Sequence, residues 1–134
     1  MGDGAVAQGA ELSHRELTEK IIGCAIEVHR ELGPGLLESS YEACLAHELG
    51  QAGLRFRRQL DLPIHYKGQS IDINYRPDII VEEAVLVELK SVERLEALHS
   101  AQLMTYLKLS RMRVGLLINF NVAVLRHGLV RRVI

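Results

Sequence analysis

Near the start of the chain, apolar residues recur every three or four positions in two stretches, which is the spacing of amphipathic helices. The first stretch begins with Ser13 and Glu16, which together have the form of a capping box, and it ends at Gly33-Pro34-Gly35. The second follows at once and ends near Gly50 and Gly53. We expect the first helix to bury Leu17, Ile21, Cys24, Val28 and Leu32, and the second to bury Leu37, Tyr41, Cys44, Leu45 and Leu49.

The pattern then alternates between apolar and polar residues, which is typical of strands with one face in water. One long strand is expected over residues 54–66, followed by a turn at Lys67-Gly68-Gln69-Ser70 and a return strand from Ile71. Two further strands, Asp78 to Val81 and Val85 to Val92, are rich in β-branched residues and are separated by a short acidic turn.

The last third of the chain predicts a helix and a buried strand. The helix is expected from Glu96 to Leu109, and the apolar run Val114 to Ile118 predicts a strand buried on both faces. A strand, helix, strand connection implies that the two strands are parallel. Short edge strands are expected at Val122 to Leu125 and Leu129 to Val133. The order of elements therefore predicts an α/β fold with a mixed sheet.

Length and composition add a domain plan and a compartment. A chain of 134 residues with 48% hydrophobic residues fits one domain, expected over residues 13–134, after a mobile Gly- and Ala-rich tail at 1–12. No apolar run approaches the roughly 20 residues of a membrane span, and no signal peptide pattern is present, so a cytoplasmic location is expected. Cys24 and Cys44 lack Cys-x-x-Cys spacing and are expected to be small core residues.

Charge is distributed unevenly. The net charge of -1 argues against a strongly basic coat for nucleic acid, and the absence of Trp argues against a base-stacking platform. No acidic residue follows Glu96, however. The six basic residues after it are Lys108, Arg111, Arg113, Arg126, Arg131 and Arg132. They either form a local phosphate-attracting face or are solvated surface that balances the acidic first half.

Three charged residues interrupt the apolar strands. Asp78, Glu88 and Lys90 stand where the middle of a sheet is expected, and buried charges require an explanation. Glu88 and Lys90 are two apart on one strand and share a face. A two-residue loop would pair Asp78 with Val87, whereas a three-residue loop or a bulge would set it opposite Glu88. We expect the second arrangement.

Two adjacent carboxylates repel and raise one another's pKa unless a divalent cation lies between them. An Asp, a Glu and a Lys on one face are what a hard metal ion and an activated water require. The alternative is that Glu88 and Lys90 form a solvated ion pair. Glu38 shares the inward face of the second helix, either as a third carboxylate beside the metal or because a helix N-terminus favours negative charge.

Several motifs occur together. Gly35-Leu36-Leu37-Glu38-Ser39-Ser40-Tyr41 reads GxxExxY, the strands carry Pro-Asp and Glu-x-Lys, and the later helix carries Gln102-x-x-x-Tyr106. From about residue 14 to the end, the chain resembles the PD-(D/E)XK nuclease superfamily and, more closely, its small bacterial GxxExxY branch. The resemblance implies a restriction endonuclease-like α-β-β-β-α-β core. In this core a mixed central sheet is flanked by helices, with an extra N-terminal helix and short C-terminal strands added.

The resemblance also implies a chemistry. The matching positions are the acidic metal-binding residues Glu38, Asp78 and Glu88, the water-positioning Lys90, and the nucleic-acid-site residues Gln102 and Tyr106. The expected function is hydrolysis of nucleic acid, DNA favoured, with Mg²⁺ or Mn²⁺ held by these carboxylates and by the backbone carbonyl of Leu89. Two alternatives stay open. One is a catalytically silent module that binds nucleic acid or a protein partner, and the other is a homodimer or partner-dependent subunit.

Overall fold

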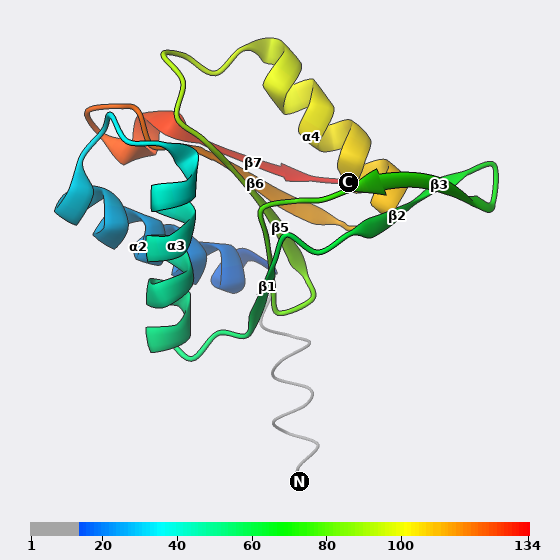
Figure 1. The fold of residues 1–134 in the computed structure, drawn as a ribbon, viewed down its shortest axis with the longest axis horizontal. Coiled ribbons are helices and arrows are strands. Elements are labelled where there is room, and N and C mark those ends of the chain that lie inside the picture. The colour runs from blue at the N-terminus through cyan, green and yellow to red at the C-terminus, as the bar shows by residue number, and fades with distance from the viewer. Residues whose placement is uncertain (1–13) are drawn as a thin grey trace, which may run out of the picture.

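The computed structural model describes residues 14–134. The expected tail at 1–12 and the capping residue Ser13 lie outside the described residues. The elements are α2 (His14–Leu32), α3 (Glu38–Gln51), β1 (Phe56–Arg58), β2 (Leu62–Tyr66), β3 (Gln69–Tyr75), β4 (Ile79–Val81), β5 (Val85–Lys90), α4 (Ala97–Ser110), β6 (Val114–Asn119), the 3₁₀ helix η1 (Leu125–Gly128) and β7 (Leu129–Val133). Helices α2 and α3 cover one face of a central sheet and α4 covers the other (Figure 1).

The central sheet has five strands in the order β1-β4-β5-β6-β7. Strands β5 and β6 are parallel, with Val85 beside Val114, and the other neighbours are antiparallel. The parallel pair follows from the α4 crossover, because a helix must carry the chain back before the next strand can start at the same end. The α/β class and the mixed sheet flanked by helices are therefore confirmed.

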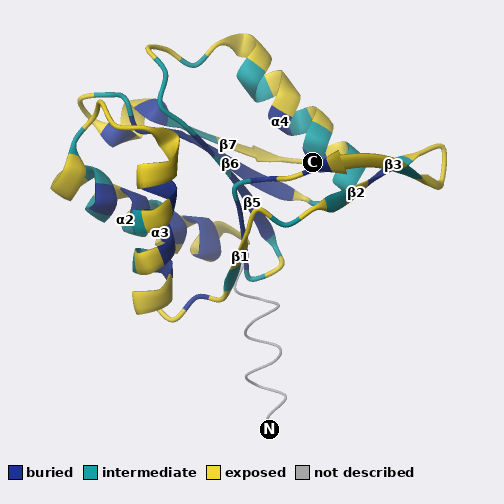
Figure 2. Ribbon diagram, viewed as in Figure 1, coloured by how far each residue is buried: buried dark blue, intermediate teal, exposed yellow. Residues whose placement is uncertain are grey.

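Strand β5 divides the core into two layers because its side chains alternate between the faces. Val85, Val87 and Leu89 pack with residues of α2 and α3, whereas Leu86 packs against Leu103 and Leu107 of α4. Every residue of β6 is buried, as its continuous apolar run predicts, and Figure 2 shows this dark blue centre between the helices. By the same alternation, Glu88 and Lys90 lie on the α4 side of the sheet.

The prediction of a single strand over residues 54–66 is wrong. The chain turns at Gln59, whose φ is 54°, and the two halves join different sheets. Strand β1 pairs with β4, whereas β2 and β3 form a separate two-stranded hairpin that extends from the body in Figure 1. The turn of this hairpin is at Lys67-Gly68, where both φ angles are positive, as in the type I′ turns that favour two-residue hairpins.

The prediction of two short C-terminal strands is also wrong for one of them. Strand β7 forms as expected, but residues 122–124 form a loop and Leu125 is the first residue of η1. The chain returns so tightly against the end of β6 that a Cβ on Gly128 would lie 2.2 Å from the Asn119 carbonyl oxygen. Leu37, expected on the buried side of α3, is 76% exposed because it precedes the helix as its N-cap.

Two smaller expectations concern the cysteines and the membrane. Cys24 and Cys44 are free, half-buried and packed against the core, as expected of small apolar residues. Among the described residues, none of the helices combines the length and the apolar character needed to cross a lipid bilayer.

Candidate active site

The loop between β4 and β5 sets the position of Asp78. Ile79 pairs with Val87, and continuing that register by one step brings Asp78 opposite Glu88. The loop holds three residues, Glu82 to Ala84, which is the longer of the two possibilities and the one expected from the sequence. Because the loop is three residues long, the two acidic residues are neighbours across the strands.

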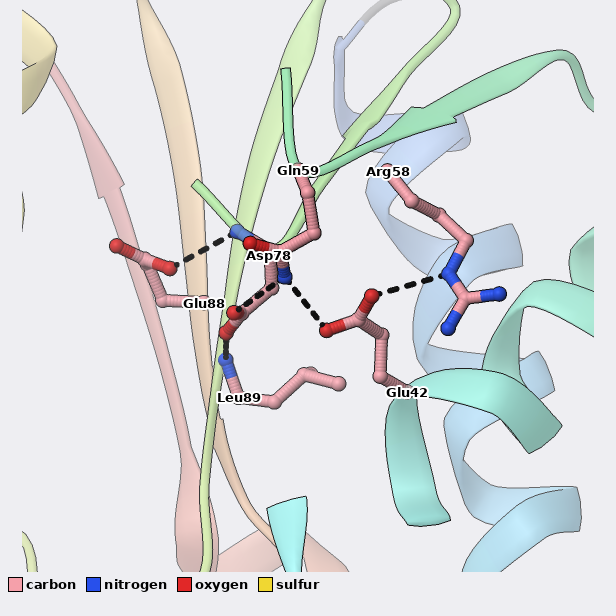
Figure 3. Close-up of polar contacts among 6 residues, drawn as sticks. All are labelled: Glu42, Arg58, Gln59, Asp78, Glu88 and Leu89. Carbon is pink, nitrogen blue, oxygen red and sulfur yellow. Dashed lines mark hydrogen bonds and ion pairs between the residues drawn. The ribbon is translucent and has the colours of Figure 1, made fainter. Parts of the chain in front are cut away.

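Two hydrogen bonds from backbone N–H groups to carboxylate oxygens connect the Asp78 and Glu88 segments (Figure 3). The Asp78 N–H donates to Oε1 of Glu88 at 3.2 Å, and the Leu89 N–H donates to Oδ2 of Asp78 at 2.7 Å. At this point of the sheet, carboxylate oxygens accept the hydrogen bonds that backbone carbonyl oxygens accept elsewhere between paired strands. Pro77, which has no N–H to pair with a neighbour, immediately precedes Asp78 and loosens the ladder here. Both carboxylates are consequently fixed to the backbone of the opposite strand.

Glu88 has a second donor. The hydroxyl of Tyr75 donates to its Oε2, and the Tyr75 ring stacks on the Tyr106 ring with centroids 3.7 Å apart and planes 1° from parallel. Burial raises the pKa of Glu88 to about 7; the Tyr75 hydrogen bond opposes this rise, and the negative charge of Asp78 adds to it. Burial also raises the pKa of Tyr75, so its hydroxyl keeps its proton and acts as the donor.

Asp78 is held on its other side by a chain of polar side chains. The Gln59 amide nitrogen donates to Oδ1 of Asp78 at 3.3 Å and to Oε1 of Glu42 at 2.9 Å, and Arg58 Nε donates to Oε2 of Glu42 at 3.0 Å (Figure 3). The Gln59 N–H also donates to the Asp78 carbonyl at 3.0 Å. Glu42 is only 7% exposed. This buried carboxylate is thus connected to Asp78 through one amide group.

The structure brings together some of the residues expected from the sequence. Asp78, Glu88 and the backbone of Leu89 are in contact. Lys90 follows on the Glu88 side of the strand and is half-buried. Within residues 14–134, its ammonium group forms no hydrogen bond or ion pair. Because no carboxylate of the described residues pairs with it, this ammonium group is available to an anionic ligand.

Glu38 is placed differently from the carboxylate pair. It opens α3 two residues after Leu36, whose carbonyl oxygen accepts a 2.6 Å hydrogen bond from the Ser91 hydroxyl, so this loop lies against the end of β5. The Glu38 side chain is exposed, and in the described part of the chain no hydrogen bond or ion pair joins it to Asp78 or Glu88. Its role as a metal ligand stays a prediction.

The two residues of the expected nucleic-acid site, Gln102 and Tyr106, lie about one turn apart on α4. Gln102 is exposed, and Tyr106 is half-buried with its ring against Tyr75. Tyr41, the last residue of the GxxExxY pattern, has a structural role. Its hydroxyl donates to the Gly33 carbonyl at 2.6 Å, and its ring stacks on Phe120 at 4.4 Å, so it fixes the loop that precedes α3.

The sequence interpretation missed Glu42, Gln59 and Tyr75. Glu42 could have been found, because it lies three and seven residues before the buried Leu45 and Leu49, which is the same spacing that singled out Glu38. Nothing in the sequence marks Gln59 or Tyr75. Their roles depend on a chain reversal and on a hairpin that local patterns do not reveal.

The donor set suits a hard divalent cation. Two adjacent carboxylates supply oxygen ligands, and a cation between them would relieve the repulsion that contributes to the raised pKa of Glu88. Among residues 14–134, no three acidic, histidine or cysteine side chains are arranged to hold a metal ion. Two carboxylates are nevertheless sufficient for Mg²⁺, which usually keeps several waters and takes other ligands from substrate phosphates.

A mixed sheet flanked by helices, with an acidic pair at the end of two neighbouring strands, defines the class of restriction endonuclease-like folds. A family model described as "PD-(D/E)XK nuclease superfamily" matches residues 15–133. The chain therefore belongs to this superfamily, whose nucleases generally use divalent metal ions. Searches of curated proteins and of solved structures gave no match.

Proposed function

We propose that this chain is a metal-dependent nuclease that hydrolyses phosphodiester bonds, with DNA the favoured substrate. The observation that carries the proposal is the opposition of Asp78 and Glu88 across β4 and β5, in a member of a nuclease superfamily. Their carboxylates, with the carbonyl of Leu89, would hold Mg²⁺ or Mn²⁺. The GxxExxY pattern at Gly35–Tyr41 supports placement in the bacterial branch that carries this motif.

The chain's own residues would orient the reacting groups. Bound at the carboxylates, the ion would lower the pKa of a water and offset charge on the scissile phosphate. The backbone donors fix Asp78 and Glu88 before substrate arrives, which reduces the reorganisation needed during reaction. Lys90 would bind a phosphate oxygen and orient the attacking water. The water oxygen would bond to phosphorus as the bond to the leaving oxygen breaks; the water would give up one proton to solvent, and the leaving oxygen would take up one proton from solvent.

Surface charge supports a nucleic-acid partner. The six ion pairs of the described residues all use arginines before residue 77. None of the basic residues after Glu96 takes part in these pairs. Arg132 pairs with Gly115 in the sheet, next to Arg113, whose carbonyl accepts a hydrogen bond from the Ile134 N–H at 2.9 Å. We call Lys108, Arg111, Arg113 and Arg132 the C-terminal basic patch, and we propose that it contacts phosphates.

The second candidate is a catalytically silent module that binds nucleic acid or a protein partner. One observation favours it: all four carboxylate oxygens of Asp78 and Glu88 already accept hydrogen bonds from protein groups. At the edge of the sheet, Val133 of β7 is 49% exposed and Ile134, which follows β7, is 41% exposed, which supports a homodimer or a partner that adds a strand. A cytoplasmic location belongs to either proposal and is in keeping with the free thiols.

The test is digestion of defined DNA and RNA oligonucleotides with Mg²⁺, with Mn²⁺ and with EDTA. The proposal expects cutting that EDTA abolishes and that Lys90→Ala lowers by about 100-fold. Lys20→Ala, which removes an exposed lysine on α2, is the matched control and should cut normally. Cutting without metal, or an unimpaired Lys90→Ala protein, would refute the mechanism. Mn²⁺ binding without any cutting would favour the silent module, and light scattering would determine the oligomeric state.

A further inference from the structure

Tyr75 occupies a junction between the two sheets. It is the last residue of β3, it pairs with Leu62 at the base of the hairpin, and it is 7% exposed. Its hydroxyl reaches Oε2 of Glu88 on the central sheet. A buried side chain from the hairpin therefore contacts the acidic pair directly.

The Glu88 carboxylate has one protein donor for each of its oxygens. Oε1 accepts from the Asp78 N–H and Oε2 accepts from the Tyr75 hydroxyl. A glutamate side chain has several rotatable bonds, and two donors on rigid strands restrict it to one orientation. Partners that orient metal-ligating side chains typically change metal affinity or activity by about 10- to 100-fold.

The Tyr75 ring is in turn held by Tyr106. The two rings lie flat on each other with centroids 3.7 Å apart. This stack lies between the hairpin and α4 and prevents the Tyr75 ring from rotating away from Glu88. Tyr106 belongs to the Gln-x-x-x-Tyr pattern, but its ring contact is with protein.

We propose that Tyr75 is the positioning residue of the Glu88 carboxylate, and that Tyr106 acts on the site through Tyr75. Its hydroxyl sets the orientation in which Glu88 meets a divalent cation. This inference rests on the proposed function in taking Glu88 as a metal ligand, and it adds a residue that the family motifs do not contain.

The test compares Mn²⁺ affinity by calorimetry at pH 8 and at pH 8.5, both above the pKa of about 7 of Glu88 in the wild-type chain. Loss of the Tyr75 hydrogen bond raises this pKa, so a deficit caused by protonation of Glu88 would shrink at the higher pH, whereas a deficit caused by misorientation would not. Tyr75→Phe removes only the hydroxyl and keeps the ring stack, and it should weaken the Kd by about tenfold or more. Tyr66→Phe is the matched control, because Tyr66 is 58% exposed at the far end of the same hairpin. It should leave the Kd within about twofold of wild type.

Thermal melting and cleavage separate positioning from general destabilisation. Tyr75→Phe should raise the metal concentration for half-maximal cleavage, while its melting temperature and its affinity for DNA stay close to wild type. Tyr106→Leu, which keeps apolar bulk but loses the flat stack, should weaken Mn²⁺ binding in the same direction. It also provides the test if Tyr75→Phe does not fold. An unchanged Kd in Tyr75→Phe would overturn the inference, and an unchanged Kd in Tyr106→Leu would overturn its second half.

The outcomes distinguish this inference from the proposed activity. A wild-type chain that binds Mn²⁺ but cuts nothing refutes nuclease activity. The Mn²⁺ affinities of Tyr75→Phe and wild type can still be compared in that case. A wild-type chain that cuts, beside a Tyr75→Phe chain with wild-type Mn²⁺ affinity, overturns the inference alone. A wild-type chain that binds no Mn²⁺ overturns the inference, because Glu88 would then not be a metal ligand.

Discussion

The Asp78 N–H donates a hydrogen bond to Oε1 of Glu88, so the two acidic residues of the candidate site are linked across β4 and β5. The link has two effects. It orients Glu88, and it holds two negative groups close together in a partly buried place, where their repulsion adds to the effect of burial on the pKa of Glu88. A divalent cation between the two carboxylates would cancel their repulsion, and it would bind Glu88 in the orientation that this hydrogen bond maintains.

The raised pKa of Glu88 predicts a dependence of stability on pH. Its pKa is about 7 in the folded chain, against an ordinary value of 4.5, so the folded state binds the proton more tightly. The stabilisation from this group is full below the ordinary value and is lost as pH rises through about 7. Without metal, the free energy of unfolding should therefore be lower at pH 8 than at pH 5, by on the order of 1 to 3 kcal/mol.

Urea denaturation at the two pH values measures this difference. Glu88→Gln should remove it, because the amide does not ionise. Glu93→Gln, which changes an exposed glutamate after β5, is the control and should keep the wild-type difference. If Glu88→Gln shows the same pH dependence as wild type, another group is responsible for it.

Glu42 and Glu38 are rival candidates for a third carboxylate that contributes to metal binding. The sequence pattern favours Glu38, whereas the structure connects Glu42 to Asp78 through the Gln59 amide. We expect Glu42→Gln to lower Mn²⁺ affinity more than Glu38→Gln, as measured by calorimetry on both variants. The reverse order would restore Glu38 as the carboxylate that matters for metal binding.

Gln59 allows the backbone and the side chain to be tested separately. Its φ of 54° is one that glycine adopts without strain, so Gln59→Gly should keep the turn between β1 and β2. The variant loses the amide that joins Asp78 to Glu42, and we expect Mn²⁺ affinity to fall several-fold while stability changes by less than about 1 kcal/mol. Lys67→Gly makes the same change at another positive φ, far from the site, and should leave Mn²⁺ affinity unchanged.

The C-terminal basic patch predicts a salt dependence. If Arg113 and Arg132 contact phosphates, alanine at either position should reduce the slope of log K for DNA against log salt by about 0.9 per lost contact. Fluorescence anisotropy of a labelled duplex in EDTA measures this without cutting. Arg30→Ala removes an arginine already paired with Glu27 and should leave the slope unchanged. Equal slopes for all variants would mean that the patch is solvated surface.

The fold was predictable where two signals agreed. The run Val114 to Ile118 is apolar throughout and follows a helical pattern, so both its burial and its parallel pairing with β5 could be inferred. The segment 54–66 was not predictable as two strands. Its even-numbered positions stay mostly apolar across Gln59, so the alternation continues through the point where the chain turns into another sheet.

The pairing of Asp78 with Glu88 in the candidate site was predictable from the sequence, whereas the side chains that support this pair were not. Asp78 and Glu88 were found because charged residues interrupt apolar strands, and the loop length then determines how they pair. Tyr75 could not be assigned a role, because it is an ordinary strand residue until the hairpin folds against α4. Helical periodicity alone could not choose between Glu38 and Glu42, since both precede buried leucines at suitable spacings.

The central claim is that Asp78 and Glu88 together bind a divalent cation. Anomalous diffraction from crystals grown with Mn²⁺ tests it most directly, with an Asp78→Asn crystal grown in the same way as the control. The account predicts an anomalous peak between the two carboxylates in the wild-type crystal and a weakened or absent peak in the variant. A wild-type crystal without a peak at this position, or an equal peak in both crystals, would contradict it.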